Sequence, residues 1–174
     1  RVEYLSFSPF ERIDEVWIVK RALACVQIRL AWLKSGLPVA ETAQRPVIKN
    51  EEVPGMVVRP GVMIRLESGE TLLYEVVRSQ PFWKKMLADK LARYETVFRN
   101  IARTDYEGAE EPVLILCAEN EMHAAGAGEI AEKSGLKEDE VFLTDDLQFF
   151  GKNFYRSLYH FDRNGKRQCF EFAV

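Results

Sequence analysis

The sequence predicts an α/β fold in which one mixed β-sheet is flanked by helices. Strand-like runs alternate with helix-like segments, two of the runs form a hairpin, and the later runs are apolar on both faces. The chain has 174 residues, of which 47% are hydrophobic and 29% are charged. These values are typical of a globular protein and fit one core. We therefore expect a single domain over residues 1–174.

A first helix is predicted over Glu11–Ser35. Six of its apolar residues recur at alternating steps of three and four, which places them on one helix face: Val16, Val19, Leu23, Val26, Leu30 and Leu33. Gly36 and Pro38 end this helix, because glycine commonly caps a helix and proline cannot continue it. Residues 39–60 have no clear period, so we expect loop there, apart from a short strand at Pro46–Lys49.

A β-hairpin and a second helix follow. The runs Gly61–Leu66 and Thr71–Arg78 are rich in β-branched and aromatic residues, and a short turn with Gly69 joins them. Pro81 suits the first turn of the next helix, and an apolar stripe extends this helix to Arg103.

The remaining segments continue the alternation. Pro112–Ala118 and Val141–Thr144 are predicted as buried strands, since neither alternates between apolar and polar residues. A helix over Glu121–Ser134 lies between them. Phe154–Phe161 and Arg167–Phe172 are predicted as a terminal hairpin.

Composition argues against several classes of protein. Cys25, Cys117 and Cys169 are dispersed within apolar segments, which indicates reduced core thiols and not a disulfide framework. The longest strongly apolar stretch is far shorter than the roughly 20 residues of a membrane span. We expect a cytoplasmic protein that does not associate with membranes. The chain starts at Arg1 without a Met, so we also expect it to be part of a longer protein.

The net charge of −3 is unevenly distributed. Residues 1–104 carry +5, residues 105–146 carry −11 and residues 147–174 carry +3. A polyanionic partner is therefore compatible with this chain, because salt screens charges beyond about 10 Å and only the local field matters.

Glu75 is the strongest candidate for chemistry. It lies near the end of an apolar strand, where a carboxylate costs several kcal/mol to desolvate unless it is paired or binds a metal. Basic residues follow it, and we expect these to bind nucleic acid: Arg78, Lys84, Lys85, Lys90 and Arg93. A carboxylate beside a basic helix is typical of Mg²⁺-assisted phosphodiester chemistry. The alternative is that Glu75 pairs with one of these bases.

The order helix, strand, hairpin, helix, strand resembles the restriction-endonuclease-like fold of the PD-(D/E)XK superfamily. More narrowly, Arg59–Val62, Tyr74–Arg78 and Lys90–Tyr94 resemble motifs in the nuclease-like domain of replication-relaxation and mobilisation proteins from plasmids and integrative elements. The resemblance covers roughly residues 11–150. It implies a DNA-binding domain, preceded by a winged-helix segment, with DNA and other replication or transfer proteins as partners.

This chain departs from the family pattern at two site positions. Gly61 replaces the metal-binding Asp of the family, and Val77 is the last residue of the E-x-(K/D) motif, so neither offers a ligand. We expect an inactive nuclease-like module that binds DNA and needs no cofactor. One alternative is a Mg²⁺- or Mn²⁺-dependent deoxyribonuclease, with Glu75 and Lys90 catalytic and with Glu75 and Glu15 as metal ligands.

Two further functions stay open. The acidic stretch Asp105–Asp146 suits a protein-interaction domain with a basic partner and no role in nucleic-acid binding. Gly126 and Gly128 fit a G-x-G-x-x-A pattern after a strand, as in dinucleotide-binding folds. They lie inside a predicted helix, however, so we interpret them as small residues that allow close packing on the sheet. Cys117 is interpreted as a core residue of a buried strand, and not as a nucleophile with His123 as its base.

Overall fold

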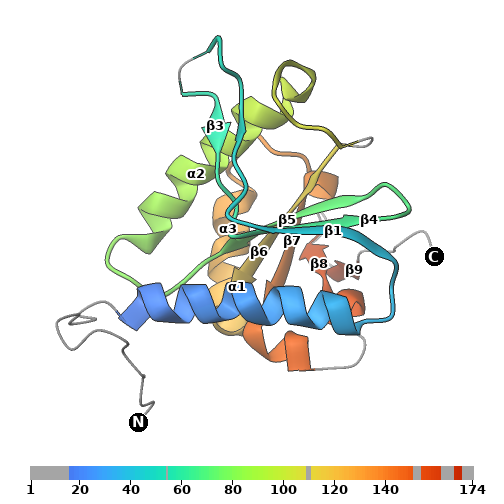
Figure 1. Cartoon of the computed structure of the whole chain (residues 1–174). Coiled ribbons are helices and arrows are strands. Elements are labelled where there is room, and N and C mark those ends of the chain that lie inside the picture. The colour runs from blue at the N-terminus through green and yellow to red at the C-terminus, as the bar shows by residue number, and fades with distance from the viewer. Residues whose placement is uncertain (1–15, 54, 109–110, 151–153, 162–166, 170–174) are drawn as a thin grey trace, which may run out of the picture.

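A seven-stranded mixed sheet forms the centre of the molecule, with the strand order β1-β4-β5-β6-β7-β8-β9 (Figure 1). The computed structural model describes residues 16–53, 55–108, 111–150, 154–161 and 167–169. Helices pack on both faces of this sheet, so the predicted α/β class with a mixed sheet is confirmed.

The first half of the sheet is an antiparallel meander. After helix α1 (Val16–Lys34), the strands β1 (Val39–Gln44), β4 (Val62–Leu66) and β5 (Thr71–Val76) pair in turn. β4 and β5 are the predicted hairpin, and Gly69 in its turn has a φ of 112°, which glycine adopts without strain. β1 lies in the segment that the sequence predicts as loop. The loop prediction is therefore wrong for these six residues.

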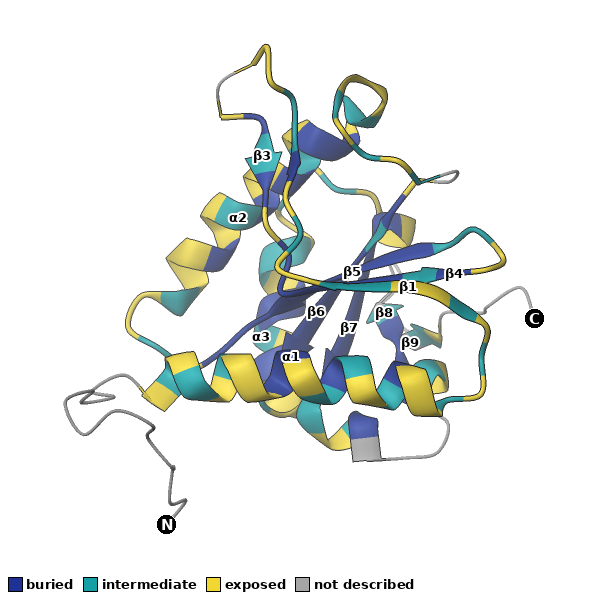
Figure 2. Cartoon of the chain, in the orientation of Figure 1, coloured by how far each residue is buried: buried dark blue, intermediate teal, exposed yellow. Residues whose placement is uncertain are grey.

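β5 and the next two strands of the sheet run parallel to one another. β6 (Val113–Ala118) pairs with β5, and β7 (Val141–Asp145) pairs with β6. Helix α2 (Trp83–Phe98) connects β5 to β6, and helix α3 (Glu121–Ala131) connects β6 to β7. These are the crossover helices that parallel strands need, and all three strands are buried (Figure 2).

Short elements complete the chain. β2 (Ile48–Lys49) and β3 (Val57–Val58) form a separate two-stranded ribbon, and β8 (Tyr159–Phe161) and β9 (Arg167–Cys169) extend the main sheet antiparallel to β7. Short 3₁₀ helices occupy Ile101–Arg103, Glu138–Glu140, Asp146–Phe150 and Phe154–Ser157. The predicted terminal hairpin therefore exists, but its first strand is shorter, and its turn lies outside the described residues.

Two hydrophobic cores lie on opposite faces of the sheet. One core is built from α2, α3 and the β2–β3 ribbon packed on side chains such as Leu73 and Leu114. The other is built from α1 and the 3₁₀ segments after β7, packed on side chains such as Leu72 and Ile115. Consecutive residues of β5 thus enter different cores, as the period of two in a strand requires.

The face of α1 that is buried differs from the apolar stripe on which the helix prediction rests. Ala24, Cys25, Ile28 and Trp32 pack on the sheet. Most of the predicted apolar stripe is exposed instead, as the yellow segments of α1 in Figure 2 indicate. Both faces of α1 are apolar, so the spacing identifies the helix but not the side that it buries. None of the described helices combines the length and the apolar composition that a membrane span requires.

Candidate functional site

Glu75 lies at the carboxyl end of β5 and points to the α2 side of the sheet. Its neighbours Tyr74 and Val76 belong to the core under α1, whereas Val77 belongs to the core under α2. Only 2% of Glu75 is exposed. A carboxylate with this little contact with water needs partners inside the protein.

Three side chains bind the Glu75 carboxylate. Lys90 Nζ lies 2.5 Å from Oε1, and Arg21 Nη2 donates to the same oxygen over 3.2 Å. The Tyr94 hydroxyl donates to Oε2 over 3.3 Å. Lys90 and Tyr94 lie one turn apart on α2, which is why both reach one carboxylate. The interpretation that Glu75 pairs with a base of the following helix is therefore confirmed.

The charges of this cluster add up to a positive value. Two cations lie within hydrogen-bonding distance of one carboxylate, so Glu75, Arg21 and Lys90 together carry a net charge of +1. Burial, followed by the negative charge of Glu75, raises the pKa of the Tyr94 hydroxyl, so Tyr94 remains a neutral donor. A divalent cation would be repelled here, and a phosphate would be attracted.

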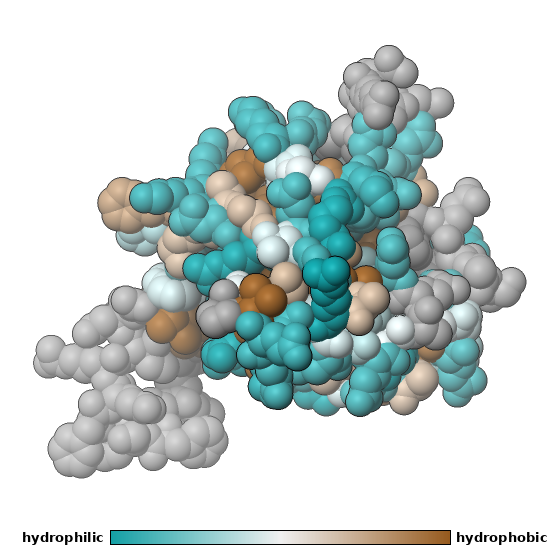
Figure 3. Space-filling model, turned by 90° about the horizontal axis from the view of Figure 1, so that it is seen from above, coloured by the Kyte–Doolittle hydropathy of each residue, from teal (hydrophilic) through white to brown (hydrophobic). Residues whose placement is uncertain are grey.

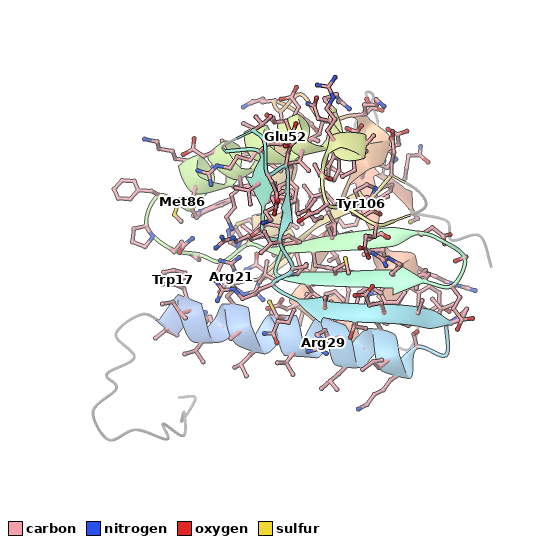
Figure 4. The ribbon with its side chains drawn as sticks, turned by 45° about the horizontal axis from the view of Figure 1, so that its top comes forward. Trp17, Arg21, Arg29, Glu52, Met86 and Tyr106 are labelled. Atoms are coloured by element: carbon pink, nitrogen blue, oxygen red, sulfur yellow. The ribbon has the colours of Figure 1, made fainter. Side chains whose placement is uncertain are left out.

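A cavity of about 90 Å³ opens beside Glu75, between α1 and α2. Its charged lining consists of Arg21, Glu75, Arg78 and Lys90. Trp17, Trp83 and Met86 line its apolar part. In Figure 4, Trp17 and Arg21 extend from α1 on one side of this opening, and Met86 lies on α2 on the other. The cavity therefore combines positive charge with aromatic surface.

Gly61 and Val77, the two positions at which the chain departs from the motif that it resembles, are tightly packed. The backbone N–H of Gly61 donates to the Tyr74 carbonyl over 2.7 Å. A Cβ at Gly61 would lie 3.0 Å from Cys25 Sγ and 3.2 Å from the Tyr74 carbonyl oxygen, so a larger side chain would require neighbouring atoms to shift. Val77 is buried in the core under α2. Both positions serve packing in this structure.

The predicted nucleic-acid-binding residues fall into two groups. Lys84, Lys85 and Arg93 are exposed on α2, and Lys90 is partly exposed beside Glu75. Arg78, in contrast, has a side chain that is 1% exposed. It donates to the carbonyl oxygens of Val77 and Cys117 and forms a 2.8 Å ion pair with Asp146. Arg78 is therefore not at the surface where a phosphate would bind.

Arg21 is the residue that sequence reasoning missed at this site. It lies on the same face of α1 as Ala24, Cys25 and Ile28, which are all buried. A single cation on an otherwise apolar buried face signals a buried counter-ion, but the sequence alone does not show that this face of α1 is the buried one. Glu15, the other proposed metal ligand, lies outside the described residues.

The remaining candidate residues have structural roles. Gly128 lies against Leu143 of β7, where a Cβ would be 2.9 Å from Cδ1, so close packing on the sheet is confirmed for Gly128. Gly126 instead faces Trp83 of α2. Cys117 is fully buried, and this burial raises the pKa of its thiol. His123 instead packs edge-on against Trp83, with ring centroids 4.2 Å apart. Cys169 is exposed, so the expectation that all three thiols lie in the core is wrong for it.

Among the described residues, no group of three or more His, Cys, Asp or Glu side chains is arranged to hold a metal ion. Comparison of the chain with models of protein families, with curated proteins and with solved structures finds no match.

Proposed function

We propose that this domain binds DNA without cleaving it, as an inactive nuclease-like module in a protein of mobile-element replication or DNA transfer. The environment of Glu75 carries the proposal. The single carboxylate at the end of β5 is bound by Lys90, Arg21 and Tyr94 in place of a metal ion. The order of α1, the meander, α2 and β6 is also the element order on which the family resemblance rests.

The absence of cleavage is argued from charge and coordination. A Mg²⁺ nuclease site needs carboxylate oxygens that are free to bind the ion. Both oxygens of Glu75 already accept hydrogen bonds, and two of the three donors are cations. Gly61 and Val77 supply no second carboxylate. The cluster is therefore stable without a metal and positive in sign.

DNA binding is argued from the cations that remain accessible. The side chains of Arg21 and Lys90 are each 33% exposed at the cavity. Lys84, Lys85 and Arg93 add positive charge along the exposed side of α2. Phosphate neutralisation by such residues supplies most of the affinity of non-specific DNA binding. Trp17 and Trp83 offer surfaces on which an unpaired base can stack.

Fluorescence anisotropy with a labelled single-stranded and a labelled duplex DNA tests the binding part. We expect affinity to fall steeply with salt, and the double variant Lys84→Ala/Lys85→Ala to weaken binding about 10-fold and lower the salt slope by roughly two. The matched control is Lys34→Ala/Lys133→Ala, which removes the same charge at exposed positions on α1 and beyond α3. Equal losses in both variants, or no binding at low salt, would contradict the proposal.

Incubation of supercoiled plasmid with the protein and Mn²⁺ or Mg²⁺ tests the second part. We expect no nicking. Nicking that disappears in Glu75→Ala would contradict the proposal and establish the nuclease alternative. Nicking that persists in Glu75→Ala would not originate at this carboxylate, and the proposal would stand.

A further inference from the structure

The side of α1 that faces away from the sheet is apolar and exposed. Leu23 and Leu33 are 56% and 60% exposed, and Val16, Val26 and Leu30 are nearly half exposed. Figure 1 shows α1 at the border of the molecule, and in Figure 4 the side chains on its outer side point away from the sheet. The face in Figure 3, by contrast, is mostly hydrophilic with small separate apolar patches. A row of large apolar side chains such as this one marks an interaction surface.

The spacing of this row is that of a helix-pairing seam. We name it the α1 seam; its residues are Val16, Val19, Leu23, Val26, Leu30 and Leu33. Steps of three and four that repeat every seven residues are the a and d positions of a coiled coil. This seam is narrower than the broad apolar face of a helix that lies in a membrane surface. The spacing therefore favours a second helix as the occupant.

The α1 seam is complementary to itself when two copies run antiparallel. Layers then form between residues whose numbers add up to the same value: Val16 with Leu33, Val19 with Leu30, and Leu23 with Val26 of the second copy. Every layer contains one Val and one Leu, so all six layers have the same side-chain volume. A parallel pair would instead contain three smaller Val–Val layers and three larger Leu–Leu layers, which pack less evenly.

The charges beside the seam also select the antiparallel arrangement. α1 carries four basic residues and no acidic residue between Val16 and Lys34. In the antiparallel pair, Lys20 lies nearest to Gln27 of the second copy, and Arg29 lies nearest to Ala22. A parallel pair would bring Arg29 beside Lys34, where like charges repel.

We propose that this chain forms a two-fold symmetric dimer in which α1 pairs antiparallel with α1 of a second copy. The contact is isologous, because the same surface serves both subunits. It does not depend on DNA binding, since the seam lies opposite the face of α1 that packs on the sheet. A specific protein–protein interface buries at least about 1,000 Å² of surface, and a single pair of helices of this length buries an area close to this lower limit. We therefore expect a dissociation constant in the micromolar range.

Sedimentation velocity from about 1 µM to about 200 µM tests the dimer. We expect a concentration-dependent shift from monomer to dimer, and at least a 10-fold weaker association in Leu30→Glu. The matched control is Ile18→Glu, because Ile18 is 49% exposed and Leu30 is 47% exposed on the same helix, but Ile18 lies outside the seam. A protein that stays monomeric, including one that binds phosphatidylserine vesicles as a monomer, would overturn the proposal. Dimers equally weakened by both variants would also overturn it.

Cysteine cross-linking tests the direction of the pair. Cys169 is exposed and is first replaced by Ser to remove its reactivity. A mixture of the Leu23→Cys and Val26→Cys proteins should then form far more disulfide-linked dimer than either protein alone, because these positions share a layer. Faster cross-linking of each protein with itself would overturn the antiparallel arrangement.

Discussion

Lys90 Nζ and Glu75 Oε1 lie 2.5 Å apart and join α2 to the end of β5. The same carboxylate oxygen accepts a hydrogen bond from Arg21 of α1, so one side chain of the sheet contacts the helices of both layers. Glu75 and Lys90, which are catalytic in the nuclease alternative, thus form an ion pair. An ion pair of this kind positions the walls of the cavity, and it leaves the surroundings of Glu75 positive.

We expect Glu75 and Lys90 to be coupled in stability. Glu75→Gln and Lys90→Met should each lower the free energy of unfolding by about 1–3 kcal/mol, less than for a fully buried pair because Lys90 is one-third exposed. The double variant should cost at least about 1 kcal/mol less than the two single losses combined. Urea denaturation measures all three. The exposed pair Lys49–Glu51 serves as the control and should show little coupling, because solvent screens its charges.

Glu75→Gln should tighten DNA binding. The substitution removes the negative charge from a cluster that contains Arg21 and Lys90, so their positive charges become available to a phosphate. We expect the affinity to rise several-fold and the salt slope to steepen by roughly one. Glu67→Gln, which removes the same charge at the exposed hairpin turn, should leave affinity nearly unchanged. Weaker binding by Glu75→Gln in anisotropy titrations would contradict the electrostatic account.

Gly61→Ala should destabilise the protein. The new Cβ would approach Cys25 Sγ to 3.0 Å and Val76 Cγ2 to 3.3 Å, which overpacks the contact between α1 and β5 at a cost of about 1–3 kcal/mol. Adding Cys25→Ala should recover part of this loss. Gly126→Ala is the matched control with the opposite sign. It lies inside α3 with its nearest neighbour at 3.4 Å, so alanine should be neutral or stabilising by up to about 1 kcal/mol. Thermal denaturation compares all four proteins.

The pair Arg99–Glu140 should stabilise the protein in a pH-dependent way. Arg99 donates to both carboxylate oxygens of Glu140. Although burial raises the pKa of Glu140, hydrogen bonds from Arg99 and from the Lys137 backbone hold it below its ordinary value. A depressed carboxyl pKa stabilises the folded state above the unfolded pKa, and this contribution is lost as the pH falls.

Glu140→Gln should therefore cost about 1 kcal/mol near pH 7, a modest value because the side chain of its partner Arg99 is 37% exposed. Its difference from the unsubstituted protein should shrink as the pH falls from about 5 to about 3. Urea denaturation over this range measures the change. Asp139→Asn, an exposed neighbour, is the control and should show little effect. A loss in Glu140→Gln that stays constant with pH would show that packing, and not charge, sustains the contact.

His123 should make stability fall at mildly acidic pH. Burial lowers its pKa, and the charge of Arg78 lowers it further against the opposing effect of Glu119. The folded state therefore binds this proton less readily than the unfolded state. Stability is complete above the unfolded pKa of about 6.5 and declines as the pH drops below it. Urea midpoints between about pH 7.5 and about pH 5 should show this slope, and His123→Phe should flatten it. An unchanged slope in the variant would contradict this assignment.

The sheet was predictable where the signals are local. The runs that became β5 and β6 are apolar over consecutive residues, and Gly69 marks the hairpin turn. β1 was not predictable, because its sequence Val-Ala-Glu-Thr-Ala-Gln is short and partly polar. This edge strand exists through its pairing with β4, and a pairing partner is not a property of a local window.

The candidate site was predictable in part for the same reason. Glu75 is a carboxylate in an apolar strand, so the local sequence identifies it as a candidate. Lys90 and Tyr94 are four residues apart in a predicted helix, so their spacing places them on one helix face. Arg21 lies 54 residues before Glu75, so only the fold brings the two together. Arg78 was expected at the surface and is buried, because Asp146, 68 residues later, provides its counter-ion.

The sequence by itself determined that α1 is a helix and that it is apolar on two sides. The tertiary structure decided which side covers the sheet. Helical spacing sets the directions of side chains around the axis, but burial depends on what each side meets. The small residues Ala24 and Cys25 allow close approach to the sheet, and Trp32 donates a buried 2.8 Å hydrogen bond to Tyr74. Long-range packing of this kind placed the more regular apolar row of α1 on the outside.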